Sequence, residues 1–168
     1  PRQNGAVTPS PTAGGPTGAD VLGRFSEPTQ DWFRGAFAEP TAAQAGAWDA
    51  VSTGRHALVV APTGSGKTLA AFLWALDRIT AEPVDAEADP LQRCRVLYVS
   101  PLKALATDVE RNLRSPLVGV RQAATRRGLT LPDVQVGVRT GDTPPNERRQ
   151  FATKPPDILI TTPESLFL

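Results

Sequence analysis

The sequence predicts an α/β fold in which a parallel sheet is covered by helices on both faces. Four short apolar runs alternate with helix-like segments along the chain, and this alternation is typical of parallel sheets. A glycine-rich loop follows the first apolar run directly and precedes a long apolar-periodic segment. Because ligands of such sheets bind beyond the carboxyl ends of the strands, the loops after the apolar runs are where functional residues are expected.

The composition bounds the class of protein. With 168 residues, 40% of them apolar, the chain has room for one domain with a core. The single cysteine, Cys94, excludes a disulfide framework and a thiolate zinc cluster, and it fits a cytoplasmic location. The single histidine, His56, argues against Ser-His-Asp or histidine–metal chemistry. No membrane association is expected, because no apolar run approaches the roughly 20 residues that cross a bilayer.

The N-terminal segment differs from the rest of the chain. Its first 20 residues are rich in Pro, Gly, Thr and Ala and hold Val7 as their only sizeable apolar side chain. Such a segment buries too little surface to offset its ordering entropy. Residues 1–24 are therefore expected to be disordered, and the domain to span residues 25–168. Because the chain begins with Pro rather than Met, it is expected to be a fragment or a processed chain.

The first half of the domain is expected to hold three helices and one strand. Thr41, after Pro40, suits a helix N-cap, and Gly54 suits a helix stop. A short continuous apolar run such as residues 57–61 is typical of a buried strand. The next segment has helical periodicity, with its apolar residues on one side at Leu69, Phe72, Leu73, Leu76 and Ile79. The three helices are placed at residues 29–35, 41–53 and 66–80.

The second half is expected to hold three more strands. Residues 82–93 are polar, acidic and contain Pro, so they are expected to form a surface loop. Residues 102–127 are helical by pattern and are expected to hold one or two helices. Pro116 is expected to break the helical pattern. The strands are placed at residues 96–100, 134–139 and 158–161, and two further helices at residues 145–153 and 163–168.

Residues 61–68, APTGSGKT, have the spacing of a phosphate-binding loop, with Ala61 at a position where Gly is commoner. Glycines at 64 and 66 permit backbone angles that let successive N–H groups surround phosphate oxygens. Lys67 would reach the β- and γ-phosphates of ATP, and the Thr68 hydroxyl would hold Mg²⁺. The expected nucleotide-binding residues of the loop are Pro62, Thr63, Gly64, Ser65, Gly66, Lys67 and Thr68. The alternative is a plain glycine turn in which Lys67 is a solvated charge.

Several motifs stand in a fixed order along the chain. They are FAEPTAAQ (37–44), APTGSGKT (61–68), SPLKAL (100–105), RTGDT (139–143) and TTPESL (161–166). From residue 25 onward the chain resembles the superfamily 2 helicases, and within them the Lhr-type (large helicase-related) group. A DEAD-box RNA helicase would more often show PTREL in place of PLKAL and TPGR in place of TPES. The resemblance implies a RecA-like P-loop lobe that is incomplete at its C-terminus.

The resemblance assigns Gln44 to the adenine edge, with Phe37 and Thr41 shaping the pocket. An amide suits this role because it both donates and accepts hydrogen bonds, as adenine does. From the residues alone, the alternative is that Gln44 is an exposed helix residue and Phe37 belongs to the core.

The same resemblance places three loops on a nucleic-acid strand. Helix N-termini and glycines in these loops can bring backbone N–H groups close to phosphates. The expected contacts are Ser100, Pro101, Lys103, Gly141, Thr162 and Pro163. The alternatives are a solvated lysine at 103, a simple turn at 141 and a purely capping threonine at 162. Arg139 and Arg148 are weaker candidates, and Glu164 is expected to bond protein.

No acidic D-E-x-H-type Walker B motif occurs in the sequence. The resemblance therefore implies the front part of a first motor lobe, whose second lobe lies elsewhere in the parent chain. We expect the parent to use ATP and Mg²⁺, to track single-stranded DNA or an RNA–DNA hybrid, and to serve in DNA repair. We expect the chain alone to hydrolyse no useful amount of ATP.

Three other functions remain open at this point. An RNA helicase of the same superfamily would differ in contacting sugar 2′-hydroxyls. A P-loop kinase or transport ATPase would lack the motifs that flank the phosphate loop. A non-catalytic binding module would have a degenerate loop, whereas Lys67 and Thr68 are intact.

Overall fold

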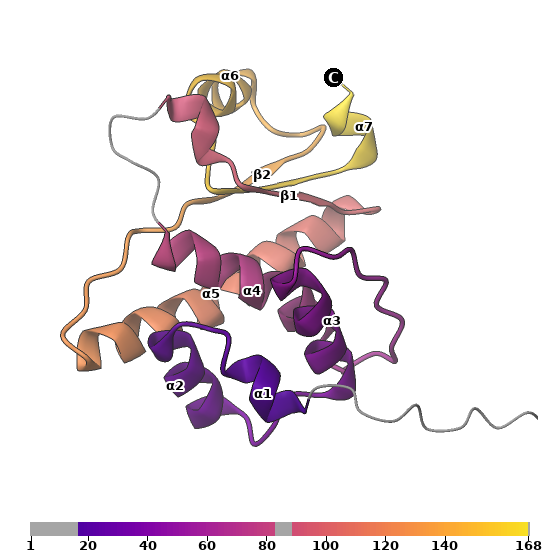
Figure 1. The fold of residues 1–168 in the computed structure, drawn as a ribbon. Helices are drawn as coiled ribbons and strands as arrows, with labels where there is room; N and C mark the ends of the chain where they lie inside the picture. The colour runs from indigo at the N-terminus through magenta and orange to yellow at the C-terminus, as the bar shows by residue number, and fades with distance from the viewer. Residues whose placement is uncertain (1–16, 83–88, 168) are drawn as a thin grey trace, which may run out of the picture.

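The computed structural model describes residues 17–82 and 89–167, and in these ranges three strands form one parallel sheet (Figure 1). Helices α4 and α5 lie on one face of the sheet and α6 and α7 on the other, while α1, α2 and α3 lie beyond α4 and α5. In chain order the elements are α1 (Gly18–Leu22), α2 (Glu27–Ala36), α3 (Ala42–Ser52), α4 (Lys67–Ala81), the 3₁₀ helix η1 (Pro90–Arg93), β1 (Val96–Val99), α5 (Lys103–Arg126), β2 (Val136–Arg139), α6 (Pro145–Thr153), β3 (Ile158–Thr161) and α7 (Pro163–Leu166).

The strand order is β1-β3-β2, so the last strand in sequence lies in the middle of the sheet. Val99 and Arg139, the last residues of β1 and β2, both pair with Thr161, the last residue of β3. The carboxyl ends of the three strands therefore meet at one edge. This confirms the expected α/β fold with a parallel sheet and brings the loops after these strands together.

One hydrophobic core fills the space between the sheet and helices α4 and α5. Phe72, Leu76 and Ile79 of α4 pack with Ile158 and Ile160 of β3. Their spacing of three and four residues places them on one helix face, and each such buried side chain contributes about 2 kcal/mol.

The opposite face of the sheet is covered in part by α6. A Cβ atom on Gly137 of β2 would lie 2.9 Å from the Phe151 ring of α6. The two layers agree with the prediction of helices on both faces.

A second core joins the N-terminal helices to the outer side of α4. Trp48 is fully buried there and meets Phe25 and Phe33 edge to face, at ring separations of 5.0 and 5.5 Å. Leu73 of α4 and Val21 of α1 complete the contact. Trp48 therefore belongs to the core.

A hydrogen-bonded carboxylate and a pair of salt bridges fix the N-terminal helices in place. The Asp77 carboxylate, almost wholly buried, accepts from the backbone N–H and the hydroxyl of Ser26 at 3.0 and 2.5 Å and thereby holds the start of α2. Arg127, which follows α5, pairs with Glu27 and Asp31 of α2. The Arg127 guanidinium beside Asp31 lowers the pKa of that carboxyl below its ordinary value.

The prediction of disorder over residues 1–24 is wrong for its last part. Thr17 and Asp20 form a reciprocal capping box, and α1 follows from Gly18. Val21 and Leu22 are buried in the second core. The Pro- and Gly-rich composition concealed a local cap and an apolar pair that together order this segment. Residues 1–16 lie outside the described part of the chain.

The strand predicted over residues 57–61 is absent from the structure. This segment has no regular secondary structure, and Leu58 and Val60 are 92% and 87% exposed. A strand needs a neighbour for its ladder hydrogen bonds, and none of the three described strands lies beside this segment. The apolar run thus carries the composition of a buried strand without a partner among the described residues.

Pro116 does not interrupt helix α5, contrary to the prediction. Helix α5 runs without interruption from Lys103 to Arg126, with Pro116 buried in its interior. An interior proline costs about 3 kcal/mol. The buried α5 residues on either side, such as Leu113 and Val120, supply packing that offsets this cost.

The remaining predicted elements are confirmed within a few residues at their ends. In the predicted loop over residues 82–93, residues 83–88 lie outside the described part, and η1 forms at Pro90–Arg93. Over the ranges 17–82 and 89–167, none of the helices has both the length and the hydropathy needed to cross a membrane.

Candidate nucleotide and nucleic-acid sites

The phosphate loop runs directly into α4, as its sequence predicted. Gly64 and Gly66 have φ angles of 82° and 77°, in the left-handed region that side-chain-bearing residues avoid. Gly66 is the N-cap of α4, so the positive end of the helix dipole faces the loop. The predicted need for glycine at both positions is confirmed.

The Lys67 side chain folds back over the loop. Its Nζ donates to the carbonyl oxygens of Ala61 and Pro62, each at 2.6 Å. The Ser65 hydroxyl donates to the same Pro62 carbonyl at 2.7 Å. The ammonium is thus held by two neutral carbonyls, which are weaker partners than phosphate oxygens. A lysine ammonium, two left-handed glycines and a helix N-terminus together fit a nucleotide phosphate.

The residue predicted to hold Mg²⁺ at this loop is Thr68, and this role stays a prediction. Thr68 lies half-buried in the first turn of α4. In the described part of the chain, no group of three or more His, Cys, Asp or Glu side chains is placed to hold a metal. The donor set fits a Mg²⁺ ion that is bound chiefly by phosphate oxygens and water, with Thr68 as the protein ligand.

Gln44 and Thr41 contact the phosphate loop. They form a capping box at the start of α3, in which the Gln44 Oε1 accepts from the Thr41 N–H at 3.0 Å. The Gln44 Nε2 donates to the Gly66 carbonyl at 3.4 Å, and the Thr41 hydroxyl donates to the Ser65 carbonyl at 3.1 Å. Gln44 is buried, so the alternative of an exposed helix residue is wrong. The adenine role of Gln44 stays a prediction.

Phe37 ends α2 and lies against the second core. Its ring packs on Phe33 and Trp32, at centroid separations of 4.9 and 5.9 Å, and 44% of the residue remains exposed. Phe37 therefore combines a core contact with an exposed surface, and its place in an adenine pocket also stays a prediction.

The loop after β1 carries one buried and two exposed candidates for nucleic-acid contact. Ser100 is fully buried, donates its N–H to the Thr161 carbonyl at 2.7 Å and directs its hydroxyl to Leu102 at 2.9 Å. Pro101 and Lys103 are exposed, and Lys103 opens α5. Of the three, Lys103 is the one that has a charged and exposed side chain, and its ammonium pairs with Asp142.

The loops after β2 and β3 flank this position. Space around Gly141 is open, since a Cβ atom there would meet nothing within 4 Å. Thr162 occupies the N-cap of α7 and Pro163 its first position, as predicted. The buried Thr162 hydroxyl donates to the Ser165 hydroxyl at 3.3 Å instead of capping the helix. The nucleic-acid roles of these residues stay predictions.

Asp142, for which no role was predicted, and Arg148, predicted as a weaker candidate for phosphate contact, also shape this edge. Asp142 forms an ion pair with Lys103. Arg148 of α6 donates to the carbonyls of Thr143 and Gly141 at 2.8 and 2.6 Å, so its guanidinium supports the loop rather than facing outward. For Gln44, the T-x-x-Q capping pattern was a usable signal. The pairing of Asp142 with Lys103 has no local sequence signal, because it joins two loops through the sheet.

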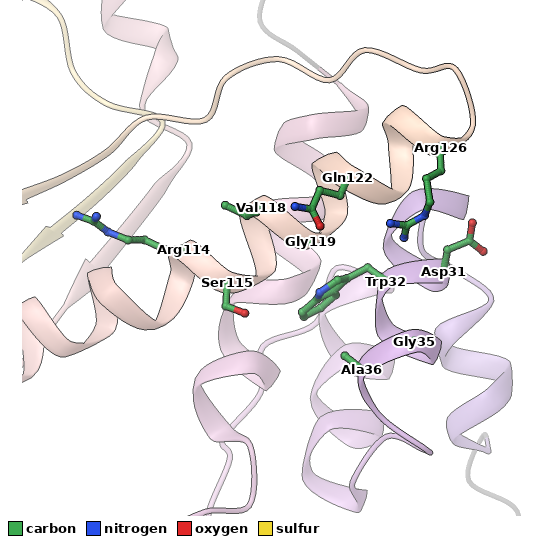
Figure 2. A pocket seen from close by; sticks show the side chains of 10 residues that line it. All are labelled: Asp31, Trp32, Gly35, Ala36, Arg114, Ser115, Val118, Gly119, Gln122 and Arg126. Atoms are coloured by element: carbon green, nitrogen blue, oxygen red, sulfur yellow. The ribbon is translucent and has the colours of Figure 1, made fainter.

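A groove of about 590 Å³ lies between α2 and α5 (Figure 2). Trp32 lies at its centre, facing Gly119 and Ser115 of α5. None of the predicted nucleotide or nucleic-acid residues lines it. A Cβ atom on Gly119 would lie 2.0 Å from the Trp32 Nε1 atom, so glycine is what allows this close approach.

Comparison with known proteins agrees with this arrangement. The DEAD/DEAH box helicase family matches residues 41–168. The chain is 64% identical over 151 residues to a Lhr helicase of Mycolicibacterium smegmatis, and 56% identical over 146 residues to the Lhr helicase/uracil glycosylase of Escherichia coli. These matches cover 90% and 86% of the chain, which spans about a tenth of the length of each relative.

A solved structure shows the same fold. The structure of the Mycobacterium smegmatis helicase Lhr bound to single-stranded DNA and AMP-PNP superposes with a TM-score of 0.78 at 62% identity. The superposition covers 88% of this chain and 18% of the Lhr chain. The chain therefore belongs to the DEAD/DEAH box helicase family and corresponds to the N-terminal region of its Lhr members, with part of a RecA-like lobe.

Proposed function

We propose that this chain is the nucleotide-binding front part of the first motor lobe of an ATP-dependent helicase that moves along single-stranded DNA. The observation that carries the proposal is the shared layout of two sites. The phosphate loop opens α4, and the loops after β1, β2 and β3 meet at one sheet edge. The Lhr relative with this fold was bound to an ATP analogue and to single-stranded DNA.

At the phosphate loop, bound MgATP would supply the phosphoryl group and the free energy of its transfer. Lys67 exchanges the Ala61 and Pro62 carbonyls for phosphate oxygens, which is favourable because a charged acceptor replaces two neutral ones. The Thr68 hydroxyl would hold Mg²⁺. The N–H groups at Gly64 and Gly66 hold the phosphates, and Thr41 and Gln44 steady the loop from α3.

At the sheet edge, Lys103 and the first turn of α5 take a strand phosphate. This helix start has no side-chain cap, so its N–H groups are free to donate to a ligand. Contacts of this kind depend on phosphate charge rather than on base identity. The proposal therefore includes binding that is independent of sequence and weakened by salt.

Hydrolysis needs a carboxylate pair that this sequence does not contain. We therefore propose that the chain by itself binds nucleotide without useful turnover. The carboxylates and a second lobe come from the remainder of the parent protein. Closure of the two lobes on ATP would then drive steps along the strand.

The test measures ATP hydrolysis by the full-length protein without nucleic acid, with single-stranded DNA and with single-stranded RNA. Lys67→Ala is the variant that removes the phosphate-binding cation. The proposal predicts strong stimulation by DNA, with loss of at least about a hundredfold in turnover in the Lys67 variant.

Each other outcome has a distinct meaning. Stimulation by RNA alone favours an RNA helicase of the same superfamily. Equal hydrolysis with and without nucleic acid favours a P-loop ATPase in which the loops after β1, β2 and β3 do not bind nucleic acid. ATP hydrolysis by the chain alone that is lost in Lys67→Ala contradicts the proposal that the carboxylates needed for hydrolysis come from the rest of the parent protein.

A further inference from the structure

Lys103 is already paired within the chain. Its ammonium forms an ion pair with the carboxylate of Asp142, in the loop after β2. Both side chains are more than half exposed, at 53% and 72%. The pair therefore lies on the surface at the sheet edge, where a strand phosphate is proposed to bind. A carboxylate of the protein thus holds the cation that the proposed function assigns to nucleic acid.

The loop that presents Asp142 is fixed on both sides. The Thr143 N–H donates to the Thr140 carbonyl at 3.1 Å, and the Thr143 hydroxyl accepts from the Thr140 N–H at 2.8 Å. Arg148 of α6 donates to the carbonyls on either side of Asp142, those of Gly141 and Thr143. A backbone held in this way presents the carboxylate to Lys103 at a small entropic cost.

The backbone that carries Lys103 is also fixed. As the first residue of α5 it follows directly the segment in which Ser100 bonds to Thr161 of β3 and to Leu102. The central strand thus fixes the start of α5, and Thr161 also donates to the Arg139 carbonyl at the end of β2 at 2.8 Å. The start of α5 and the loop after β2, which carry the ion pair, are therefore joined through the end of β3.

A carboxylate and a phosphate oxygen compete for the same ammonium. To bind a strand, Lys103 must leave Asp142, and the released carboxylate then repels the phosphate beside it. An exposed ion pair is worth about 0–1 kcal/mol, so this competition weakens strand binding without preventing it. Asp142 is therefore placed to lower the affinity of Lys103 for a strand phosphate.

We propose that Asp142 is an internal competitor of nucleic-acid phosphate for Lys103, and that it sets the affinity of this edge for a single strand. The inference rests on the proposed function, because it concerns the same strand-binding edge. In this proposal Asp142 acts on strand binding through its contact with Lys103 and makes no favourable contact with the phosphate. Arg148 is the positioning residue that holds the Asp142 loop.

The test measures the dissociation constant of the full-length protein for a fluorescent single-stranded oligothymidylate by anisotropy, at several salt concentrations. Asp142→Asn removes the competitor. Asp133→Asn is the matched control. Asp133 is also exposed and also pairs with a basic residue of α5, Arg121, but it lies before β2 instead of after it. Asp142→Asn is expected to tighten binding by about three- to fivefold, and Asp133→Asn to leave it unchanged.

A double-variant cycle separates competition from plain charge repulsion. If Asp142 acts through Lys103, Asp142→Asn tightens binding much less in the Lys103→Ala background. Equal tightening in both backgrounds overturns the inference, as does weaker binding by Asp142→Asn or an equal effect of Asp133→Asn. Failure of the wild-type protein to bind the oligonucleotide at low salt contradicts the proposed function itself.

Discussion

The side-chain amide of Gln44 donates to the Gly66 carbonyl at 3.4 Å and so joins the start of α3 to the phosphate-loop residue that caps α4. The same amide accepts from the Thr41 N–H at 3.0 Å. Gln44 is therefore a structural support of the loop in this structure, whatever contact it also makes with a base. Its two polar atoms both have partners, which explains how a buried amide is accommodated.

Replacing Gln44 with Ala should weaken nucleotide binding through the loop. The Gly66 carbonyl and the Thr41 N–H each lose a partner in a part-buried hydrogen bond, and such a bond contributes about 0.5–1.5 kcal/mol. We expect about tenfold weaker binding of ATP and a similar loss for inorganic tripolyphosphate, both measured by calorimetry. Gln122→Ala, on the exposed side of α5, is the control. A loss for ATP with none for tripolyphosphate would show that Gln44 acts at adenine instead.

Gly66→Ala should destabilise the domain more than Gly64→Ala. Both residues have positive φ angles, which cost a side-chain-bearing residue about 1–2 kcal/mol. A Cβ atom on Gly66 would also lie 2.4 Å from the Gln44 Nε2, whereas the space at Gly64 is open. Urea unfolding followed by tryptophan fluorescence measures the difference. Adding Gln44→Ala to Gly66→Ala should recover part of it, and equal costs for the two single variants would contradict this account.

Gly119→Ala should be destabilising although alanine is the better helix former. A Cβ atom at this position would meet Trp32 at 2.0 Å, and such overpacking costs about 1–3 kcal/mol. The control is Gly46→Ala in α3, where a Cβ atom would meet nothing within 4 Å. That variant should gain up to about 1 kcal/mol. Unfolding midpoints that rise for both variants would show that Trp32 moves aside freely.

The ion pair between Asp31 and Arg127 predicts a dependence of stability on acid. The hydrogen bond from Arg127 lowers the pKa of Asp31 in the folded state. A carboxyl with a lowered folded pKa stabilises the fold above its unfolded pKa of about 3.9 and loses that contribution as the pH falls through the folded value. Asp31→Asn should therefore lower the thermal midpoint at pH 7, and this decrease should become smaller as the pH falls below about 3.9. A decrease of the same size at every pH would contradict the assignment.

Local patterns in the sequence predicted much of the fold. Helix α6 has the predicted bounds because Pro145 suits its first turn. Strand β3 also has its predicted bounds, since an unbroken apolar run at the centre of a parallel sheet is buried on both faces. The glycines at 64 and 66 were predictable because the left-handed backbone excludes other residues.

The remaining features depend on contacts that local patterns do not encode. Residues 57–61 have the composition of a strand, but a strand also needs a partner, and no described strand lies beside them. Pro116 stays within α5 because burial outweighs a local preference for breaking the helix. The pairing of Lys103 with Asp142 joins residues 39 positions apart through the ends of the strands, so only the folded sheet reveals it.

The measurement that tests the central claim most directly is movement of the full-length protein along single-stranded DNA. Displacement of streptavidin from a biotinylated oligonucleotide end reports such movement. The account predicts displacement from one end that requires ATP and is lost in Lys67→Ala, with Asp133→Asn as the surface control. Hydrolysis that DNA stimulates without any displacement from either end would contradict the claim that this chain is part of a motor.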